Sequence, residues 1–138
     1  MKKLTLTICL TITLFMVSAC EESTGYQKGY AAYESGDYAT ALREFKPLAE
    51  QGDADAQNSM GWMYQKGLGV PQDFKTALKW YTLAAEQGNA YAQYNLGHMY
   101  TNGKGVPQDN KTAVKWFRLA AKQGHPRAQE QVEFLRKK

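Results

Sequence analysis

Residues 52–87 read GDADAQNSMGWMYQKGLGVPQDFKTALKWYTLAAEQ, and residues 88–123 read GNAYAQYNLGHMYTNGKGVPQDNKTAVKWFRLAAKQ. The two stretches align without a gap and are identical at 22 of 36 positions. Self-similarity at a fixed period of this length is the sequence signature of a stacked-repeat architecture. A single unit of this size cannot bury its own apolar face, so we expect the units to pack on one another.

Each unit predicts two helices joined by a loop that contains glycine and proline. The first helix should run from about Ala54 to Gln65, with Asp53 as its N-cap and Gly67 at its end. Asp73 is placed to cap the second helix, and Gly88 supplies the left-handed residue that stops it. The corresponding residues of the second copy are Asn89, Gly103, Asp109 and Gly124.

Both copies share a specific signature. Each contains Ala-x-Ala-Gln-x-x-[Leu/Met]-Gly-x-x-Tyr-x-x-Gly-x-Gly-Val-x-x-Asp, followed by Ala-x-x-Trp-x-x-x-Ala-Ala. This pattern resembles the Sel-one-like repeat, a family of the tetratricopeptide-like helical solenoids. The resemblance makes residues 52–87 and 88–123 two complete repeats.

The flanking segments look like incomplete units. Residues 26–51 predict a partial tetratricopeptide-like unit, and residues 124–138 predict a polar C-terminal capping helix on which nothing further stacks. His125 precedes Pro126 and is predicted to cap that helix, because proline favours the first helical position. The predicted fold class is therefore all-α, a short right-handed α/α solenoid of tetratricopeptide-like helical hairpins.

The shared residues predict the internal packing. Gly61 and Gly97 lack a Cβ atom, so the partner helix can approach closely. Tyr64, Trp80 and their copies are expected to fill the space between the helices, since aromatic side chains bury large areas. We interpret these recurring residues as scaffold.

The N-terminal residues look like a secretion signal. Lys2 and Lys3 precede an apolar stretch over residues 4–17, and small residues follow it, which is typical of a signal peptide at residues 1–19. The stretch is short for a spanning helix, so an uncleaved anchor is the weaker alternative.

Val17-Ser18-Ala19-Cys20 resembles the lipobox of bacterial lipoproteins. That resemblance implies that Cys20 becomes the acylated first residue of the mature chain, with residues 20–25 as a lipidated tether. Ordinary cleavage beside an unmodified Cys20 is the alternative. Glu21, in place of the Asp that retains lipoproteins at the inner membrane of enteric bacteria, favours the outer membrane, with the protein facing the periplasm. The predicted location is the bacterial cell envelope, with the membrane contacted through the lipid anchor only.

Charge and side-chain inventory argue against several classes of function. The net charge is +4, and it falls to +2 without Lys2 and Lys3, which gives no electrostatic footprint for nucleic acid. The basic tail at residues 136–138 is interpreted as a solvated end, with weak contact to an anionic surface as the alternative. Metal-ligand spacing, a supported nucleophile and a paired catalytic carboxylate are all missing from the pattern. We therefore predict no catalytic residue, no metal site, no cofactor and no small-molecule substrate.

The resemblance to tetratricopeptide-like solenoids implies that the first helix of each unit lines a concave groove. Gly29, Gly61 and Gly97 align as the shared internal glycine of these helices. Six of the nine side chains that then face the groove are aromatic, and they differ between units while the scaffold repeats, which suits a recognition surface. The predicted partner-binding residues are Tyr26, Tyr30, Tyr33, Asn58, Trp62, Gln65, Tyr91, Tyr94 and His98.

The leading functional prediction is a non-catalytic protein–protein interaction module, an adaptor or scaffold that holds a peptide or helix of an envelope protein. One alternative is an envelope enzyme of β-lactamase type, because some cysteine-rich members of the resembled family have that description. Those members carry a disulfide in each repeat, and residues 21–138 contain no cysteine. A second alternative is an immunity or inhibitor protein that binds a toxin or hydrolase through the same groove.

Overall fold

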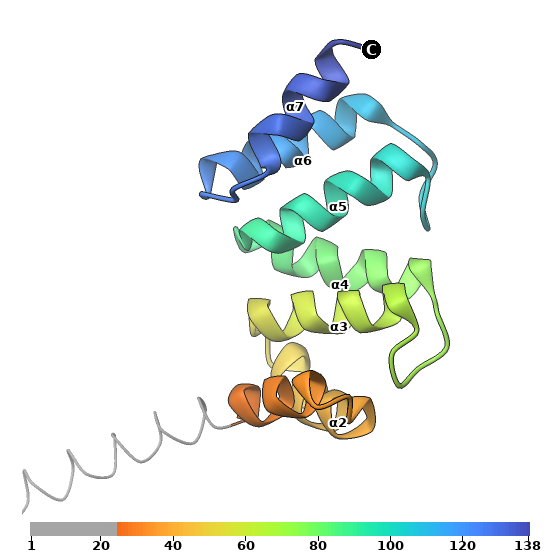
Figure 1. Ribbon diagram of the computed structural model, residues 1–138, viewed down its shortest axis with the longest axis vertical. Coiled ribbons are helices and arrows are strands. Elements are labelled where there is room, and N and C mark those ends of the chain that lie inside the picture. The colour runs from red at the N-terminus through yellow and green to blue at the C-terminus, as the bar shows by residue number, and fades with distance from the viewer. Residues whose placement is uncertain (1–24) are drawn as a thin grey trace, which may run out of the picture.

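The fold is a row of stacked helical hairpins, as Figure 1 shows for the computed structural model. The structure describes residues 25–138, so the predicted signal peptide, Cys20 and most of the tether lie outside the described residues. Every regular element within residues 25–138 is helical, which confirms the predicted all-α solenoid. Residues 25–34 are helical, and they are followed by α2 (Tyr38–Glu50), α3 (Ala54–Lys66), α4 (Phe74–Glu86), α5 (Ala90–Asn102), α6 (Asn110–Lys122) and α7 (Ala128–Arg136).

The predicted caps set the helix boundaries. Asp53 Oδ1 accepts a hydrogen bond from the Ala56 N–H at 2.8 Å and starts α3. Gly67 ends that helix in the left-handed conformation with φ +69°, as expected, and the helix itself runs to Lys66, one residue beyond the expected Gln65. Asp73 starts α4 by accepting from two backbone N–H groups and from the Thr76 hydroxyl. The same devices recur in the next repeat, where Asn89, Gly103 and Asp109 occupy the matching places.

An aromatic ring of the second helix rests on the internal glycine of the first helix in every hairpin. A Cβ atom added at Gly61 would lie 2.6 Å from the Tyr81 ring, and one at Gly97 would lie 2.7 Å from the Phe117 ring. Gly29 faces Phe45 in the same way, again at 2.7 Å. The helices are therefore too close together for any side chain at these positions, as expected for the two repeats.

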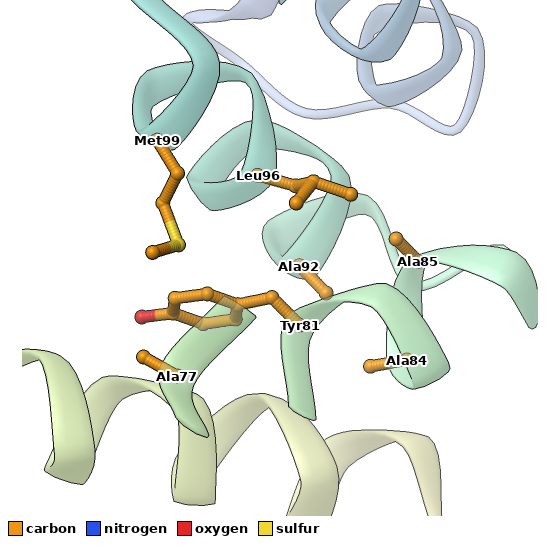
Figure 2. Packing of buried hydrophobic residues seen from close by; sticks show 7 residues of the cluster. All are labelled: Ala77, Tyr81, Ala84, Ala85, Ala92, Leu96 and Met99. Atoms are coloured by element: carbon orange, nitrogen blue, oxygen red, sulfur yellow. The ribbon is translucent and has the colours of Figure 1, made fainter. Parts of the chain in front are cut away.

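Tyr64, Trp80 and their copies pack against the core as expected, but the fully buried rings are others. Tyr81 and Phe117 are fully buried, whereas Trp80 and Trp116, one residue earlier on each helix, are half-buried. Figure 2 shows the Tyr81 ring between Ala77 and the side chains of α5. Consecutive residues of a helix point about 100° apart, so the tryptophans face a different neighbour. Trp80 packs on the core of the preceding unit and Trp116 on the core that contains Tyr81.

Buried amides also join one unit to the next. Gln57 and Gln93 are buried polar side chains, and each donates a hydrogen bond at 3.1 Å to the last turn of the preceding second helix. Gln87 in turn donates to Gln57 Oε1 at 2.8 Å. Because an unpaired amide inside a core is costly, these bonds favour one stacking register.

The glycine contact gives a testable consequence. Gly97→Ala should destabilise the fold by about 1–3 kcal/mol, because the added methyl overpacks the Phe117 ring and this outweighs a gain of up to about 1 kcal/mol in helix propensity. Urea unfolding followed by circular dichroism measures the difference. Gly25→Ala is the matched control, since its Cβ would meet Leu48 at an ordinary 3.4 Å. Equal unfolding midpoints for the two variants would contradict the packing argument.

Candidate protein-interaction groove

A groove of about 520 Å³ runs along the first helices of the units. Its walls come from the helix at residues 25–34, from α3 and from α5, and the turn before α7 closes one end. The lining residues are Tyr26, Tyr30, Tyr33, Phe45, Asn58, Ser59, Trp62, Tyr91, Tyr94, Asn95, His125, Pro126 and Arg127.

Seven of the nine side chains predicted for the groove lie around this one cavity. They are Tyr26, Tyr30, Tyr33, Asn58, Trp62, Tyr91 and Tyr94. Gln65 is turned toward the interior, where its Oε1 accepts a hydrogen bond from the Tyr81 hydroxyl at 2.7 Å. His98 is half-buried beside Tyr94 and Phe117, with ring centroids at 4.6 and 5.0 Å. These two side chains take part in packing rather than in lining the groove. That the other seven contact a partner stays a prediction.

Six residues line the groove but were not among the nine predicted from the sequence. They are Phe45, Ser59, Asn95, His125, Pro126 and Arg127. Ser59 and Asn95 occupy equivalent places in α3 and α5, each beside a residue that was chosen. Extending the 36-residue alignment by one unit pairs Arg127 with Tyr91, so the repeat period carried a signal for Arg127. Phe45 belongs to the core and reaches the groove from beneath Gly29.

Hydrogen bonds fix the aromatic side chains at the N-terminal end of the groove. Trp62 Nε1 donates to the Tyr33 hydroxyl at 2.8 Å, and the Lys66 ammonium lies 4.7 Å from the Trp62 ring centroid. The Tyr26 hydroxyl and Ser59 Oγ are 3.4 Å apart. Because these bonds tie the first unit to α3, the indole and phenol rings are held in place before any partner arrives.

A histidine stack closes the C-terminal end. The His125 ring lies parallel to Tyr94 with centroids 4.0 Å apart, and it meets Tyr91 edge-on at 5.1 Å. The prediction that His125 and Pro126 begin the last helix is wrong, because α7 begins at Ala128 and both residues lie in the preceding turn. His125 Nδ1 instead accepts a hydrogen bond from the Arg127 N–H at 3.3 Å. The turn thereby presents an imidazole to the groove.

Amides occupy the middle of the groove, and formal charge is scarce along it. Asn95 Nδ2 donates to Asn58 Oδ1 at 3.2 Å, which leaves the other polar atoms of both amides available to a ligand. Of the lining residues, Arg127 alone is fully charged at neutral pH. Burial raises the pKa of Tyr26, and burial followed by the Arg127 charge lowers the pKa of His125, so both stay neutral there. Aromatic faces flanking a pair of amides suit a segment with apolar side chains and free backbone groups.

Comparison with known proteins agrees with this architecture. The family model described as Sel1 repeat matches residues 54–89 and 90–125, which together exceed half of the chain. The chain belongs to the Sel1 repeat family. Sel1 repeat proteins generally mediate protein–protein interaction and are typically non-catalytic scaffolds. A search of curated proteins gave no match.

Solved structures of other Sel1 repeat proteins are similar to this chain. A Sel1 repeat protein from Oxalobacter formigenes is 39% identical with a TM-score of 0.76, over 80% of this chain and 45% of that one. A protective antigen of uropathogenic Escherichia coli with an SLR fold is 40% identical with a TM-score of 0.74, over 87% of this chain and 27% of that one. This chain therefore spans less than half the length of either.

Helicobacter pylori cysteine rich protein B shares the fold at a TM-score of 0.63 and 21% identity, over 80% of this chain and 93% of that protein. At that identity the likeness concerns the fold alone. In residues 25–138 of the Sel1 repeat protein described here, no helix is long and apolar enough to cross a membrane.

The folding stability of the protein should depend on the protonation state of His98. Burial, and secondarily the neighbouring His125, lowers the pKa of His98 below its ordinary value of 6.5. Because the unfolded chain then binds the proton more readily, this contribution to stability is fully present above about pH 6.5 and is lost as the pH falls toward the folded pKa.

We expect the thermal midpoint to fall between about pH 7.5 and pH 5.5, a window in which carboxylates do not titrate. His98→Gln should reduce this slope, measured by circular dichroism at each pH. An unchanged slope in the variant would show that His98 is not responsible.

Proposed function

We propose that this Sel1 repeat protein is a non-catalytic adaptor or scaffold, tethered to the bacterial envelope, whose groove holds a peptide or helix of an envelope protein. The supporting observation is the set of six aromatic side chains that lie around one cavity at positions that vary between repeats. Interface anchors are enriched in tyrosine and tryptophan, and they act best where neighbouring residues exclude water.

Two rings are placed for contact with a partner and are little used by the fold. Tyr30 is 51% exposed and Tyr91 is 61% exposed, at opposite ends of the same groove. Tyr94 and Trp62, by contrast, are held by His125 and Tyr33. A partner segment that touches both exposed rings would cross the Asn58–Asn95 pair, where its backbone groups could be hydrogen-bonded.

The envelope location rests on two lines of support. The residues before Cys20 resemble a lipoprotein signal, and the described part of the chain has no cysteine that would need a reducing compartment. Lipid attachment at Cys20 would then keep the groove near other envelope proteins, on the periplasmic side of the outer membrane.

The groove is tested by removing its exposed rings. Tyr30→Ala combined with Tyr91→Ala should weaken partner binding by roughly tenfold or more, because each truncated anchor costs more than about 1 kcal/mol. A photo-crosslinking residue at position 95, in the middle of the groove, should capture envelope partners in living cells, and the double variant should lower that yield. Mass spectrometry of the crosslinked peptides identifies what was bound.

Leu83→Ala is the matched control, since Leu83 is 47% exposed and does not line the groove. The control should leave the crosslinking yield unchanged. Equal yields from the control and the double variant, with both proteins folded, would reject the groove as the binding site.

The tether is tested separately at Cys20. Cys20→Ser should abolish acylation and release the mature chain from the membrane fraction if cleavage still occurs, or leave an unprocessed precursor if it does not. Intact-mass measurement of the N-terminal peptide distinguishes these forms. A wild-type peptide that begins at Cys20 without added acyl mass would reject lipid attachment.

A further inference from the structure

The outer surface of α6 carries a concentrated positive charge. Its four cationic residues are Lys111, Lys115, Arg118 and Lys122, and the helix contains no carboxylate. Their spacings of four, three and four residues place them on one side of the helix. All four side chains are exposed, and none forms an ion pair with any residue of the described chain.

The equivalent surfaces of the other second helices are closer to neutral. The cations of α2 have carboxylates nearby, since Arg43 lies 3.8 Å from Glu44 and Lys46 lies 3.9 Å from Glu50. On α4, Glu86 occupies the position that Lys122 occupies on α6. Lys111 and Lys115 repeat Lys75 and Lys79 of α4, whereas Arg118 and Lys122 stand where α4 has an uncharged and an acidic residue, so the excess of positive charge is specific to α6.

Apolar groups lie among these cations. A shallow cleft of about 390 Å³ is lined by the cations Lys111, Lys115 and Arg118, by the apolar side chains of Val114 and Leu135, and by Asn110. Leu119 on the same helix is 42% exposed. Cations beside exposed leucine and an apolar cleft have the composition of surfaces that lie at a membrane interface, where headgroups meet acyl chains.

We propose that this α6 surface rests on an anionic phospholipid membrane. Juxtamembrane cations are attracted to anionic headgroups, and such attraction adds to a lipid anchor. The choice of a membrane over another polyanion rests on the proposed attachment at Cys20. Residues 20–25 can span at most about 18 Å, so the first unit of an attached chain stays close to the bilayer. Because α6 lies toward the opposite end of the stack (Figure 1), its contact requires the stack to lie along the membrane. The groove belongs to the first helices and α6 is a second helix, so membrane contact leaves the groove open.

The test is amine acetylation footprinting of the full chain bound to vesicles. With Cys20 acylated as proposed, the anchor holds the protein on vesicles of either composition, so the footprint reports the orientation of the body. Vesicles of phosphatidylcholine are compared with vesicles that contain phosphatidylglycerol. Lys28 and Lys66 provide the internal reference, and mass spectrometry reads each lysine separately.

We expect labelling of Lys111 and Lys115 to slow by roughly threefold or more on phosphatidylglycerol vesicles alone. The protection should disappear in about 0.5 M NaCl, where the Debye length is about 4 Å. Equal labelling on both vesicles overturns the proposal. Protection by inorganic phosphate on phosphatidylcholine vesicles also overturns it, because it would assign a free-anion site.

A pair of charge variants separates this surface from general attraction. Lys111→Glu with Arg118→Glu should remove the protection of Lys115. Lys75→Glu with Lys79→Glu on α4 changes the charge by the same amount and should leave Lys115 protected. Loss of protection in both variants would overturn the assignment to α6. The mass of the N-terminal peptide in the same experiment reports whether Cys20 is acylated, so failure of the anchor and failure of the surface are distinguished.

Discussion

The contact between an internal glycine and an aromatic ring is the constraint on which the structure depends. Each hairpin places a ring of its second helix directly on the backbone of its first helix, at Gly29, Gly61 and Gly97. The ring fixes both the separation and the rotation of the two helices, because any other rotation would bring a side chain into the gap. One side of every first helix is thus committed to packing, and the groove consists of what the other side presents.

That commitment explains how variable residues can form one continuous surface. The first helices share a similar rotation, so most side chains at equivalent positions reach the same groove. Gln65, the equivalent of Tyr33, and His98, the equivalent of Trp62, turn to interior partners instead. Trp62 and Tyr33 come from different units yet meet at 2.8 Å, and Asn58 and Asn95 meet at 3.2 Å. Contacts of this kind between units require a repeated backbone. These contacts between units position the side chains of the groove, although they lie outside the hydrophobic core.

The sequence predicted the repeat, the caps of α3 to α6 and most of the groove, because these follow from local rules, whereas the start of α7 was predicted wrongly. Capping aspartates and left-handed glycines act within a few residues, and a 36-residue period is visible by alignment. The choice between Trp80 and Tyr81 as the buried ring was not predictable in this way, since both are large and adjacent on the helix. The positions of Gln65 and His98 depended on the same rotation. Each finds a hydrogen-bonding or aromatic partner in the interior.

The distribution of charge also follows the alternation of first and second helices. It suggests that the two rows of helices have different roles. First helices form a groove with little formal charge, and the second helix α6 carries four cations whose spacings place them on one side of that helix. The net charge of +4 does not reveal this difference, because it sums the charges of the first and the second helices. A hairpin solenoid separates its two rows of helices by construction. It can therefore present opposite chemistries on its two faces, so that contact through one face does not compete with binding through the other.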